Sequence, residues 1–400
     1  MAGVTLGFVV PWFGGDVRGG AEMQGWETAR ELARRGLSVE VLTTCSRSFL
    51  HRWDENHHRP GVTERAGVVV RRFPVDPRDE GRFASANTAL LGGARAGAAL
   101  EEDFVRQNIN SAALYRFIAE QAERYLFVFT PYLYGTTLAG AAVRPDRSLL
   151  IPCLHDEAYA YLEITRRTFL GVRGSLFFTP EEAEVARRAC GVAPPGRVTG
   201  GGIDTHLRGD AERFRRDSGL REPYLLYIGR LDRGKNTHLA VAYTRAWAYA
   251  RRRGERLVLI GSGPLEVPRN EWGIVAAGTQ DEQGKMDACA GALALCQPSV
   301  NESFSRVVME SWLNEVPVLV HADCAVTVGH CRRSGGGLWF RDYLEFCAAA
   351  DLLADDPALR RLLGEAGRRY VLAECSWDRV CERIVAAVAE LAGERVSGAA

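Results

Sequence analysis

Short, wholly apolar runs alternate along this chain with segments of helical periodicity, and the alternation begins twice. In the N-terminal half, the apolar runs Val4–Val10 and Val39–Thr43 flank Ala21–Arg35, a stretch of helical spacing that ends at Gly36. Strands without a polar face are buried on both sides, which is typical of parallel sheets covered by helices. The pattern therefore predicts an α/β fold.

The same alternation restarts after about residue 205. We expect strands at Tyr224–Gly229, Leu257–Gly261, Leu293–Gln297 and Val318–His321, with helices between them at Leu239–Arg253 and Ser305–Asn314. Four hundred residues also exceed what one hydrophobic core usually supports. We therefore predict two α/β domains, residues 1–205 and 206–374, with a ligand cleft between them and a final helical segment over residues 375–400.

One segment, residues 76–110, interrupts this rhythm. It holds Gly92-Gly93, several alanines and the acidic group Glu101–Asp103. The pattern leaves two structures open, a small helical insertion or a mobile loop.

Composition limits the partners that such a chain can have. The formal net charge is zero, which argues against sequence-independent nucleic-acid binding. No apolar run reaches the roughly 18–20 residues that span a bilayer, and the apolar start lacks the basic region of a signal peptide. Peripheral membrane contact through an arginine-rich helix stays open. Ten cysteines without a CxxC pair favour reduced thiols and a cytoplasmic protein.

The first segment with chemical content is Tyr227–Asn236. A strand ends at Gly229, and the turn that follows offers Arg230 and Lys235 near the start of a helix. Two cations in that position suit a diphosphate, although a solvated basic turn has the same sequence. Only two of the 50 basic residues are lysines, so Lys235 stands against a strong bias toward arginine. This bias favours a phosphate-binding role.

A second segment, Asn301–Glu310, follows another buried strand. Glu302 is expected in the loop and Glu310 two turns into the next helix, where they could accept hydrogen bonds from a sugar and a ribose. The helix N-terminus near Ser303–Arg306 presents free N–H groups to a ligand. The alternative is structural, with Glu302 as an ordinary N-terminal acid and Glu310 on the surface.

Two further features lie at strand ends in the N-terminal half. Pro11–Glu22 joins a strand to a helix through four glycines, Gly14, Gly15, Gly19 and Gly20, but fits neither GxGxxG nor a P-loop. His155 follows the apolar run Leu149–Leu154, where a histidine either reaches a ligand or serves a structural role. No acidic cluster indicates a metal site.

Together these segments resemble retaining glycosyltransferases of family 4, which have the GT-B architecture of two facing Rossmann-like domains. The resemblance covers most of the chain and is strongest from Tyr227 to His321. It implies that the last helix, within residues 375–400, crosses back to the first domain. The elements that carry it are Gly229-Arg230 with Lys235, the E-x7-E pair of Glu302 and Glu310, Gly19-Gly20-Ala21-Glu22, His155, and Gly201-Gly202-Ile203-Asp204.

The resemblance implies transfer of a sugar from a nucleotide diphosphate sugar to an acceptor, with retention, no covalent enzyme intermediate, no metal and no cofactor. The acceptor, a glycan, a lipid-linked molecule or a small molecule, is not identified. Implied catalytic residues are His155, Glu302, Arg230 and Lys235. The implied donor-binding residues are Gly19, Gly20, Gly229, Arg230, Lys235, Glu302, Ser303, Phe304, Ser305, Arg306, Val307 and Glu310.

One departure from the family pattern affects the donor site. The usual Glu-Gly-Phe-Gly is Glu302-Ser-Phe-Ser305 here, so two small glycines are serines and the sugar pocket is expected to narrow. This change motivates the alternative of a non-catalytic nucleotide-sugar-binding homologue. Another reaction of the same fold, phosphorolysis or sugar-nucleotide epimerisation, is a third reading.

Overall fold

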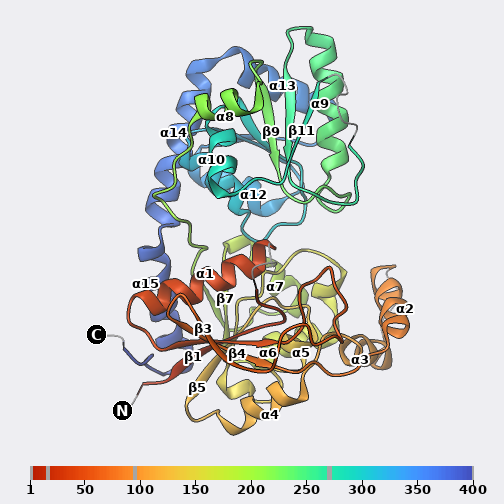
Figure 1. Ribbon diagram of the computed structural model, residues 1–400, viewed down its shortest axis with the longest axis vertical. Coiled ribbons are helices and arrows are strands. Elements are labelled where there is room, and N and C mark those ends of the chain that lie inside the picture. Colours follow the sequence, from red (N-terminus) through yellow and green to blue (C-terminus); the bar gives the residue numbers. More distant parts are fainter. Residues whose placement is uncertain (1–2, 15–18, 93–96, 268–272, 399–400) are drawn as a thin grey trace. The chain divides into compact units, whose positions relative to one another are not determined.

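The computed structural model describes residues 3–14, 19–92, 97–267 and 273–398 (Figure 1). The chain forms two units, which are described separately. The first unit comprises Met1–Gly202 together with Val380–Ala400, and the second unit comprises Ile203–Arg379. The boundaries expected from the sequence were 205/206 and 374/375.

The described residues of the first unit contain one eight-stranded sheet with the order β3-β4-β2-β1-β5-β6-β7-β8. All neighbouring strands are parallel except β3 and β4, which form an antiparallel hairpin. Its turn, Ala66-Gly67, has positive φ at both residues, the geometry that fits tight hairpins. The strands are β1 Thr5–Val10, β2 Val39–Thr44, β3 Gly61–Arg65, β4 Val68–Phe73, β5 Tyr125–Phe129, β6 Ser148–Leu150, β7 Gly174–Phe177 and β8 Gly196–Val198.

Helices cover both faces of this sheet. Side chains of β1 and β5, including Val9 and Phe127, form a core with residues of α4, α6 and α7, while α1 packs against β1, β2 and β4. On α15, Leu391 packs against Gly174 of β7. The helices are α1 Gly20–Arg34, α2 Glu80–Leu91, α3 Ala98–Arg106, α4 Ala112–Glu120, α5 Gly135–Leu138, α6 Glu163–Gly171, α7 Pro180–Cys190 and α15 Trp377–Ala392, with 3-10 turns at Pro145–Arg147 and Ala158–Tyr161.

The described residues of segment 76–110 are largely helical and belong to the first unit. Helices α2 and α3 pack against each other and share a small apolar core that includes Leu90, Phe104 and Leu162. Both carboxylate oxygens of Glu101 accept hydrogen bonds from the backbone at the start of α6. Residues 93–96, with Gly93, lie outside the described residues.

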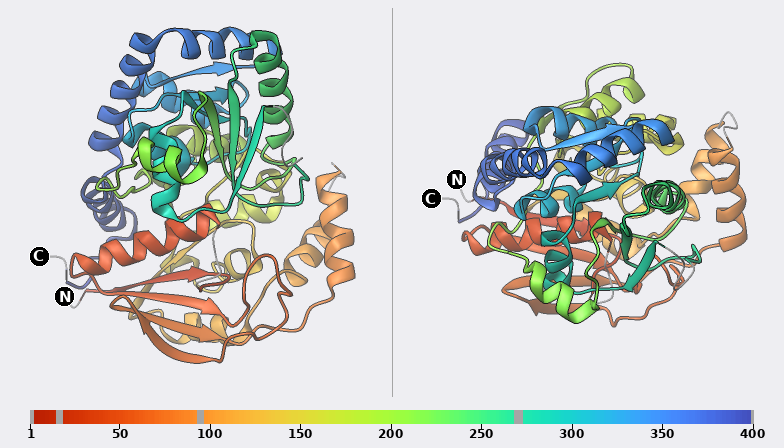
Figure 2. Two further views of the ribbon diagram at one scale, coloured as in Figure 1. Left: turned by 45° about the horizontal axis from the view of Figure 1, so that its top comes forward. Right: turned by 90° about the horizontal axis from the view of Figure 1, so that it is seen from above.

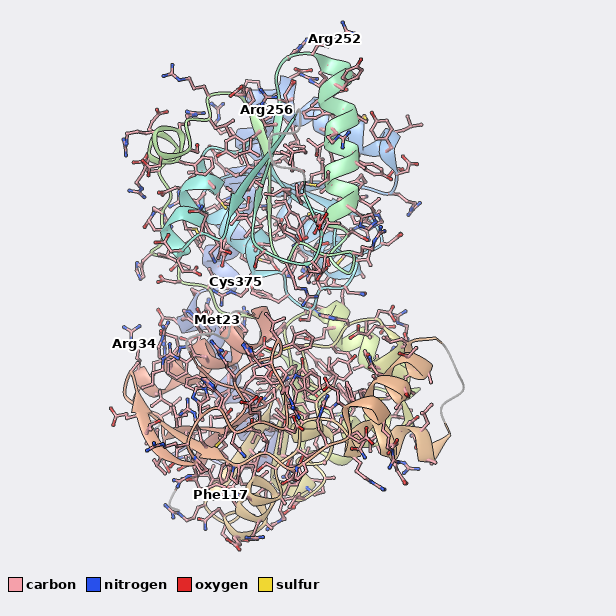
Figure 3. The ribbon with its side chains drawn as sticks, turned by 45° about the vertical axis from the view of Figure 1, so that its right-hand side comes forward. Met23, Arg34, Phe117, Arg252, Arg256 and Cys375 are labelled. Carbon is pink, nitrogen blue, oxygen red and sulfur yellow. The ribbon has the colours of Figure 1, made fainter. Side chains whose placement is uncertain are left out.

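The described part of the second unit contains a six-stranded parallel sheet with the order β11-β10-β9-β12-β13-β14. In Figure 3, Arg252 and Arg256 mark one end of this unit, where β10 begins, and Cys375 lies at the opposite end. The strands are β9 Tyr224–Ile228, β10 Arg256–Ile260, β11 Ile274–Gly278, β12 Ala294–Gln297, β13 Val318–His321 and β14 Gly337–Phe340.

Helices lie on both faces of this sheet (Figure 2). Leu225, Tyr227 and Leu257 pack with α9 and α13 in one apolar core, and α10, α11 and α12 also pack against strands of the sheet. The helices of the unit are α8 Ala211–Ser218, α9 Thr237–Arg251, α10 Glu282–Ala290, α11 Arg306–Leu313, α12 Ala325–Ser334, α13 Tyr343–Asp355 and α14 Pro357–Glu374. The predicted α/β fold class with parallel sheets is confirmed.

The structure differs from the sequence prediction mainly at short or exposed strands. The predicted strand Leu149–Leu154 ends at Leu150, because Pro152 has no N–H for the ladder and Cys153 has a positive φ. Strand β3 was not expected, since all five of its residues are exposed and carry no apolar pattern. Nine of the ten cysteines are buried. In the part of the chain that is described, no helix is long and apolar enough to cross a bilayer.

A buried histidine, His330, lies on α12 of the second unit. Its Nδ1 lies 3.0 Å from the hydroxyl of Tyr370, and its ring meets those of Phe304 and Trp312 edge to face. Burial lowers the pKa of His330 to about 3. The folded protein therefore keeps this imidazole neutral well below pH 6.

We predict that His330 makes the unfolding free energy fall as the pH drops below 6.5. In the unfolded chain the imidazole of His330 is protonated below about pH 6.5, whereas in the folded chain it is protonated only below about pH 3. Between these values His330 contributes a loss of about 1.4 kcal/mol per pH unit. Denaturant unfolding from pH 7 to pH 4 measures the slope, and His330→Gln should flatten it. An unchanged slope in the variant would contradict the prediction.

Candidate functional site

The order of strands in the second unit brings together two loops that are far apart in the sequence. From β9 the chain proceeds outward through β10 and β11, whereas from β12 it proceeds in the other direction through β13 and β14. The sheet therefore has a topological switch point between β9 and β12. Ligands of open α/β sheets bind outside the carboxyl ends of the strands at such a point. The loops that follow β9 and β12 are the two segments singled out in the sequence.

Lys235 and Glu302 meet at this switch point. The Nζ atom of Lys235 lies 2.7 Å from Oε1 of Glu302 and 3.4 Å from the carbonyl oxygen of Asn301. A second contact joins the loops, since the side-chain amide of Asn236 donates to the carbonyl of Pro298 at 3.1 Å. The sequence did not predict this ion pair, although it identified both of its members.

The loop after β9 is held in shape by its own side chains. Asp232 accepts a hydrogen bond from the backbone N–H of Lys235 at 2.8 Å and pairs with the guanidinium of Arg230. The carbonyl of Arg230 accepts from the hydroxyl of Tyr227 at 2.7 Å. The side chain of Arg230 is 55% exposed, so this cation can turn toward a ligand. Asp232 was missed in the sequence, where nothing distinguishes it from other loop acids.

Glu310 is buried, and the surface position considered for it is wrong. Only 3% of the residue is exposed, because α11 packs between α10, α14 and the sheet. Its Oε1 lies 3.6 Å from a guanidinium nitrogen of Arg306, and its Oε2 has no hydrogen-bond partner among the described residues. A buried carboxylate oxygen without a partner is costly, so this atom is a candidate ligand for a hydroxyl group.

Lys285 on α10 supplies a positive charge near Glu310. Burial lowers the pKa of Lys285, but the carboxylates of Glu310 and Glu282 outweigh it and raise that pKa above its ordinary value. Its Nζ also lies 2.6 Å from Glu282. Lys285 was not among the predicted site residues, although its being the second of only two lysines was a usable signal.

The start of α11 contains the serines that replace the family's glycines. Ser305 precedes the helix with φ +64°, a left-handed conformation, and Asn236 precedes α9 with φ +54°. Neither side chain caps its helix. Both helices therefore begin at the switch point without a cap from the side chain that precedes them, and the positive end of each helix dipole favours an anion there. Of the remaining predicted residues here, Phe304 is buried, and Ser303, Arg306 and Val307 are partly exposed.

In the first unit, the glycine-rich loop follows β1 at that sheet's own switch point, between β1 and β5. Gly19 precedes α1 and Gly20 begins it. A Cβ atom at Gly19 would collide with the carboxylate of Glu22, which accepts a hydrogen bond from the indole of Trp12 at 3.0 Å. Residues 15–18, with Gly15, lie outside the described residues.

His155 lies in the loop after β6, one strand away from that switch point. Its Nδ1 is 3.6 Å from Oε1 of Glu157, and the hydroxyl of Tyr132 donates to the same oxygen at 2.9 Å. The ring is partly exposed. Glu157 therefore lies beside the ring of His155 and is itself held by Tyr132.

A buried glutamate on α7 fixes the loop that carries His155. One oxygen of Glu182 accepts from the backbone N–H of Leu154 at 2.7 Å, and the other accepts from Phe178 at 2.6 Å. Burial raises the pKa of Glu182 to about 8, against the lowering effect of these N–H groups. Sequence reasoning missed Glu182, because only the fold brings the loops after β6 and β7 together.

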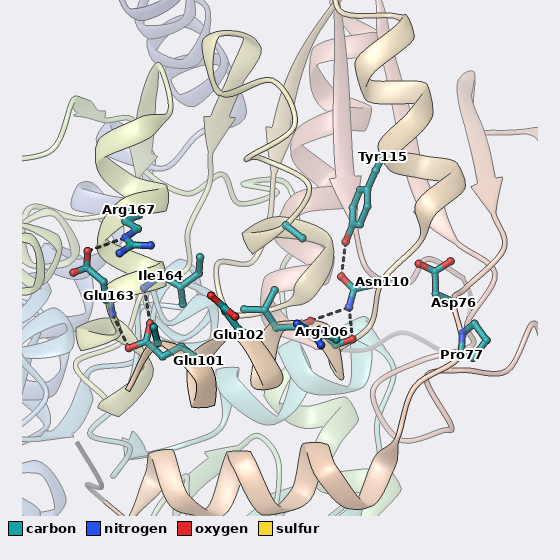
Figure 4. Close-up of a pocket in the computed structure, with 13 residues that line it drawn as sticks. Asp76, Pro77, Glu101, Glu102, Arg106, Asn110, Tyr115, Glu163, Ile164 and Arg167 are labelled. Carbon is teal, nitrogen blue, oxygen red and sulfur yellow. Dashed lines mark hydrogen bonds and ion pairs between the residues drawn. The ribbon is translucent and has the colours of Figure 1, made fainter. Parts of the chain in front are cut away.

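A cavity of about 610 Å³ lies elsewhere in the first unit, between α3, α4 and α6 (Figure 4). Figure 4 shows Tyr115 pointing to Asn110 on one side of it and Glu101 binding the start of α6 on the other. None of the predicted site residues lines this cavity. Among the described residues of the whole chain, no group of three or more histidine, cysteine or acidic side chains could hold a metal ion.

The fold defined by these two units is that of GT-B glycosyltransferases. Sucrose-phosphate synthase from Thermosynechococcus elongatus matches with a TM-score of 0.70 and 18% identity, over 97% of this chain and 99% of that one. HepE from Anabaena, in complex with UDP and glucose, matches with a TM-score of 0.69 and 14% identity, over 96% and 99%. WaaG, a glycosyltransferase of lipopolysaccharide biosynthesis, matches with a TM-score of 0.66 and 13% identity, over 96% and 99%. No family model and no curated protein matches the sequence.

We predict that Glu182→Ala lowers the unfolding free energy by about 2 kcal/mol or more, because it removes the side chain that accepts from two backbone N–H groups and leaves a cavity. Denaturant unfolding measures the difference. Glu184→Ala is the matched control, since Glu184 lies on the same helix in an exposed pair with Arg187 and should change little. Equal stability of Glu182→Ala and the wild type would show that the two N–H groups do not depend on this carboxyl.

Proposed function

We propose that this protein is a glycosyltransferase that moves a sugar from a nucleotide diphosphate donor to an acceptor. The observation that carries the proposal is the meeting of Lys235 and Glu302 across the switch point of the second unit. A cation for phosphate and a carboxylate for hydroxyl groups there match the two chemical parts of such a donor. The buried, unpartnered oxygen of Glu310 adds an acceptor for the ribose.

The shared fold supports the same proposal. The HepE structures hold UDP and UDP-glucose, and a trehalose-6-phosphate structure from E. coli holds UDP-2-fluoroglucose; both match this chain over nearly its whole length. UDP is accordingly the first donor nucleotide to test. The acceptor stays unassigned, whether a glycan, a lipid-linked molecule or a small molecule.

The mechanism that we propose is front-face transfer with retention, of the kind that family 4 enzymes use. As the bond from the anomeric carbon to the diphosphate breaks, negative charge grows on the leaving phosphate. Arg230, Lys235 and the uncapped N-termini of α9 and α11 would stabilise that charge without a metal ion. Glu302 would hold the sugar hydroxyls, and His155 would contact the transferred sugar.

The remaining assignments belong to the same proposal. The backbone of Gly19, Gly20 and Gly229 would lie against the donor, and Ser303 to Val307 would line it. We place the protein in the cytoplasm with no resident cofactor, on the composition of the chain. A cleft between the two units is part of the expected GT-B architecture.

Ligand binding provides the first test. We predict that at least one of UDP, GDP, TDP and ADP raises the melting temperature, since a ligand at 100 times its Kd adds about 2.7 kcal/mol of stability. A thermal-shift screen measures this in the wild type and in Lys235→Ala, where the shift should shrink. If all four nucleotides leave the melting temperature unchanged, the proposed donor site is wrong.

Activity provides the second test. We predict that Lys235→Ala and Glu302→Gln each reduce transfer about 100-fold, because each removes a group that acts on the charge or position of the donor. Release of the nucleotide from its sugar with an acceptor panel measures transfer, and circular dichroism checks folding. Arg233→Ala is the matched control, an exposed cation of the same loop. Wild-type rates in both variants would rule the mechanism out, and binding without any turnover would favour a non-catalytic homologue.

A further inference from the structure

The hydroxyl of Ser305 is buried and has no hydrogen-bond partner among the described residues. Only 5% of Ser305 is exposed. A buried hydroxyl without a partner destabilises a fold, and native chains avoid such groups. Four other hydroxyls among the described residues, those of Thr43, Thr136, Ser175 and Thr244, also lack a partner, but of the five only Ser305 has a left-handed backbone.

Capping of α11 does not explain it. Ser111 and Thr179 precede their helices with extended backbone, and their hydroxyls accept hydrogen bonds from Leu114 and Glu182. Ser305 precedes α11 with φ +64° and ψ 72°, and its side chain makes no capping bond. An N-cap serine normally has extended backbone, so this conformation takes the hydroxyl out of its usual role.

The backbone at this position also favours glycine. A left-handed conformation costs a side chain with a Cβ atom about 1 kcal/mol or more. Serine is therefore worse than glycine for stability on two counts, strain and an unpartnered hydroxyl. Sites where a chain accepts such costs are commonly functional.

The surroundings of Ser305 identify the chemistry of its partner. It lies at the positive end of α11, three residues after Glu302 and its bond to Lys235. The nearby carboxylate oxygen of Glu310 is likewise buried without a partner. A hydroxyl that donates beside a helix N-terminus and a lysine suits an anionic acceptor.

We propose that the Ser305 hydroxyl donates a hydrogen bond to a phosphate oxygen of the nucleotide diphosphate donor. This inference rests on the proposed function and adds a side-chain ligand where the family pattern has only a glycine backbone. The hydroxyl of Ser305 supplies a hydrogen-bond donor that strengthens binding of the diphosphate, while the left-handed backbone of Ser305 is strained in the free protein.

The test compares Ser305→Ala with Ser311→Ala, a matched pair on the same helix. The hydroxyl of Ser311 is buried too, but it donates to the carbonyl of Val316 at 3.0 Å. Calorimetry with UDP, GDP, TDP, ADP and inorganic pyrophosphate measures Kd, and thermal unfolding without ligand measures Tm. Ser305→Gly completes the set by relieving the strain.

We expect Ser305→Ala to weaken binding of the nucleotide and of pyrophosphate about tenfold, while Tm stays unchanged or rises. Ser305→Gly should weaken binding equally and raise Tm by about 2 °C. Ser311→Ala should lower Tm and leave Kd unchanged. This opposite pattern separates a ligand contact from a structural hydroxyl.

Three results would overturn the inference. Wild-type Kd in Ser305→Ala would show that the hydroxyl is not a ligand, and a fall in Tm would show that it has a partner within the protein. A loss confined to the nucleotide, with pyrophosphate binding intact, would move the contact from the phosphates to the nucleoside. If the wild type binds no nucleotide, the proposed function itself fails; if Lys235→Ala loses binding and Ser305→Ala does not, only this inference fails.

Discussion

The reversal of strand order between β9 and β12 is the constraint on which the donor site depends. Because these strands are neighbours, Lys235 and Glu302 lie within 2.7 Å although 66 residues separate them. Without a ligand the two charges satisfy each other, which keeps both side chains ordered near the carboxyl ends of the strands. A bound diphosphate would compete with Glu302 for the ammonium group of Lys235. Once Lys235 pairs with the diphosphate, the carboxylate of Glu302 would be available to accept hydrogen bonds from sugar hydroxyls. In the free protein the ion pair thus keeps Lys235 and Glu302 at the positions where each would contact the donor.

Much of the second unit could be predicted from the sequence, for a physical reason. Strands such as β9 and β13 are buried on both faces, so their apolar runs stand out from the polar loops around them. The loops that carry Lys235 and Glu302 were found because they follow such runs. The exposed β3 has no such pattern. Strand order and the burial of Glu310 depend on contacts between distant segments and leave no local signal.

The structure of segment 76–110 also could not be predicted from local sequence. Its alanines and glycines fit either a helix or a loop, and only tertiary contacts decide. Glu101 accepts backbone hydrogen bonds at the start of α6, and the hydroxyl of Tyr159 donates to Asn87 at 2.5 Å. These bonds tie α2 and α3 to the chain that follows His155. The insertion therefore supports one of the predicted catalytic loops, a role that the sequence alone did not indicate.

Stability alone would favour a different sequence at the start of α11. Glycine would fit the left-handed backbone of Ser305, and a shorter or apolar side chain would avoid the buried, unpartnered oxygens of Ser305 and Glu310. Both groups belong to the single stretch that follows β12 at the switch point. Buried polar atoms without a partner also occur elsewhere among the described residues, for example at Thr136, but those of Ser305 and Glu310 lie in the loop and helix that follow β12. The combination of these two atoms with the Lys235–Glu302 ion pair and two helix N-termini without side-chain caps suits a polar, anionic ligand.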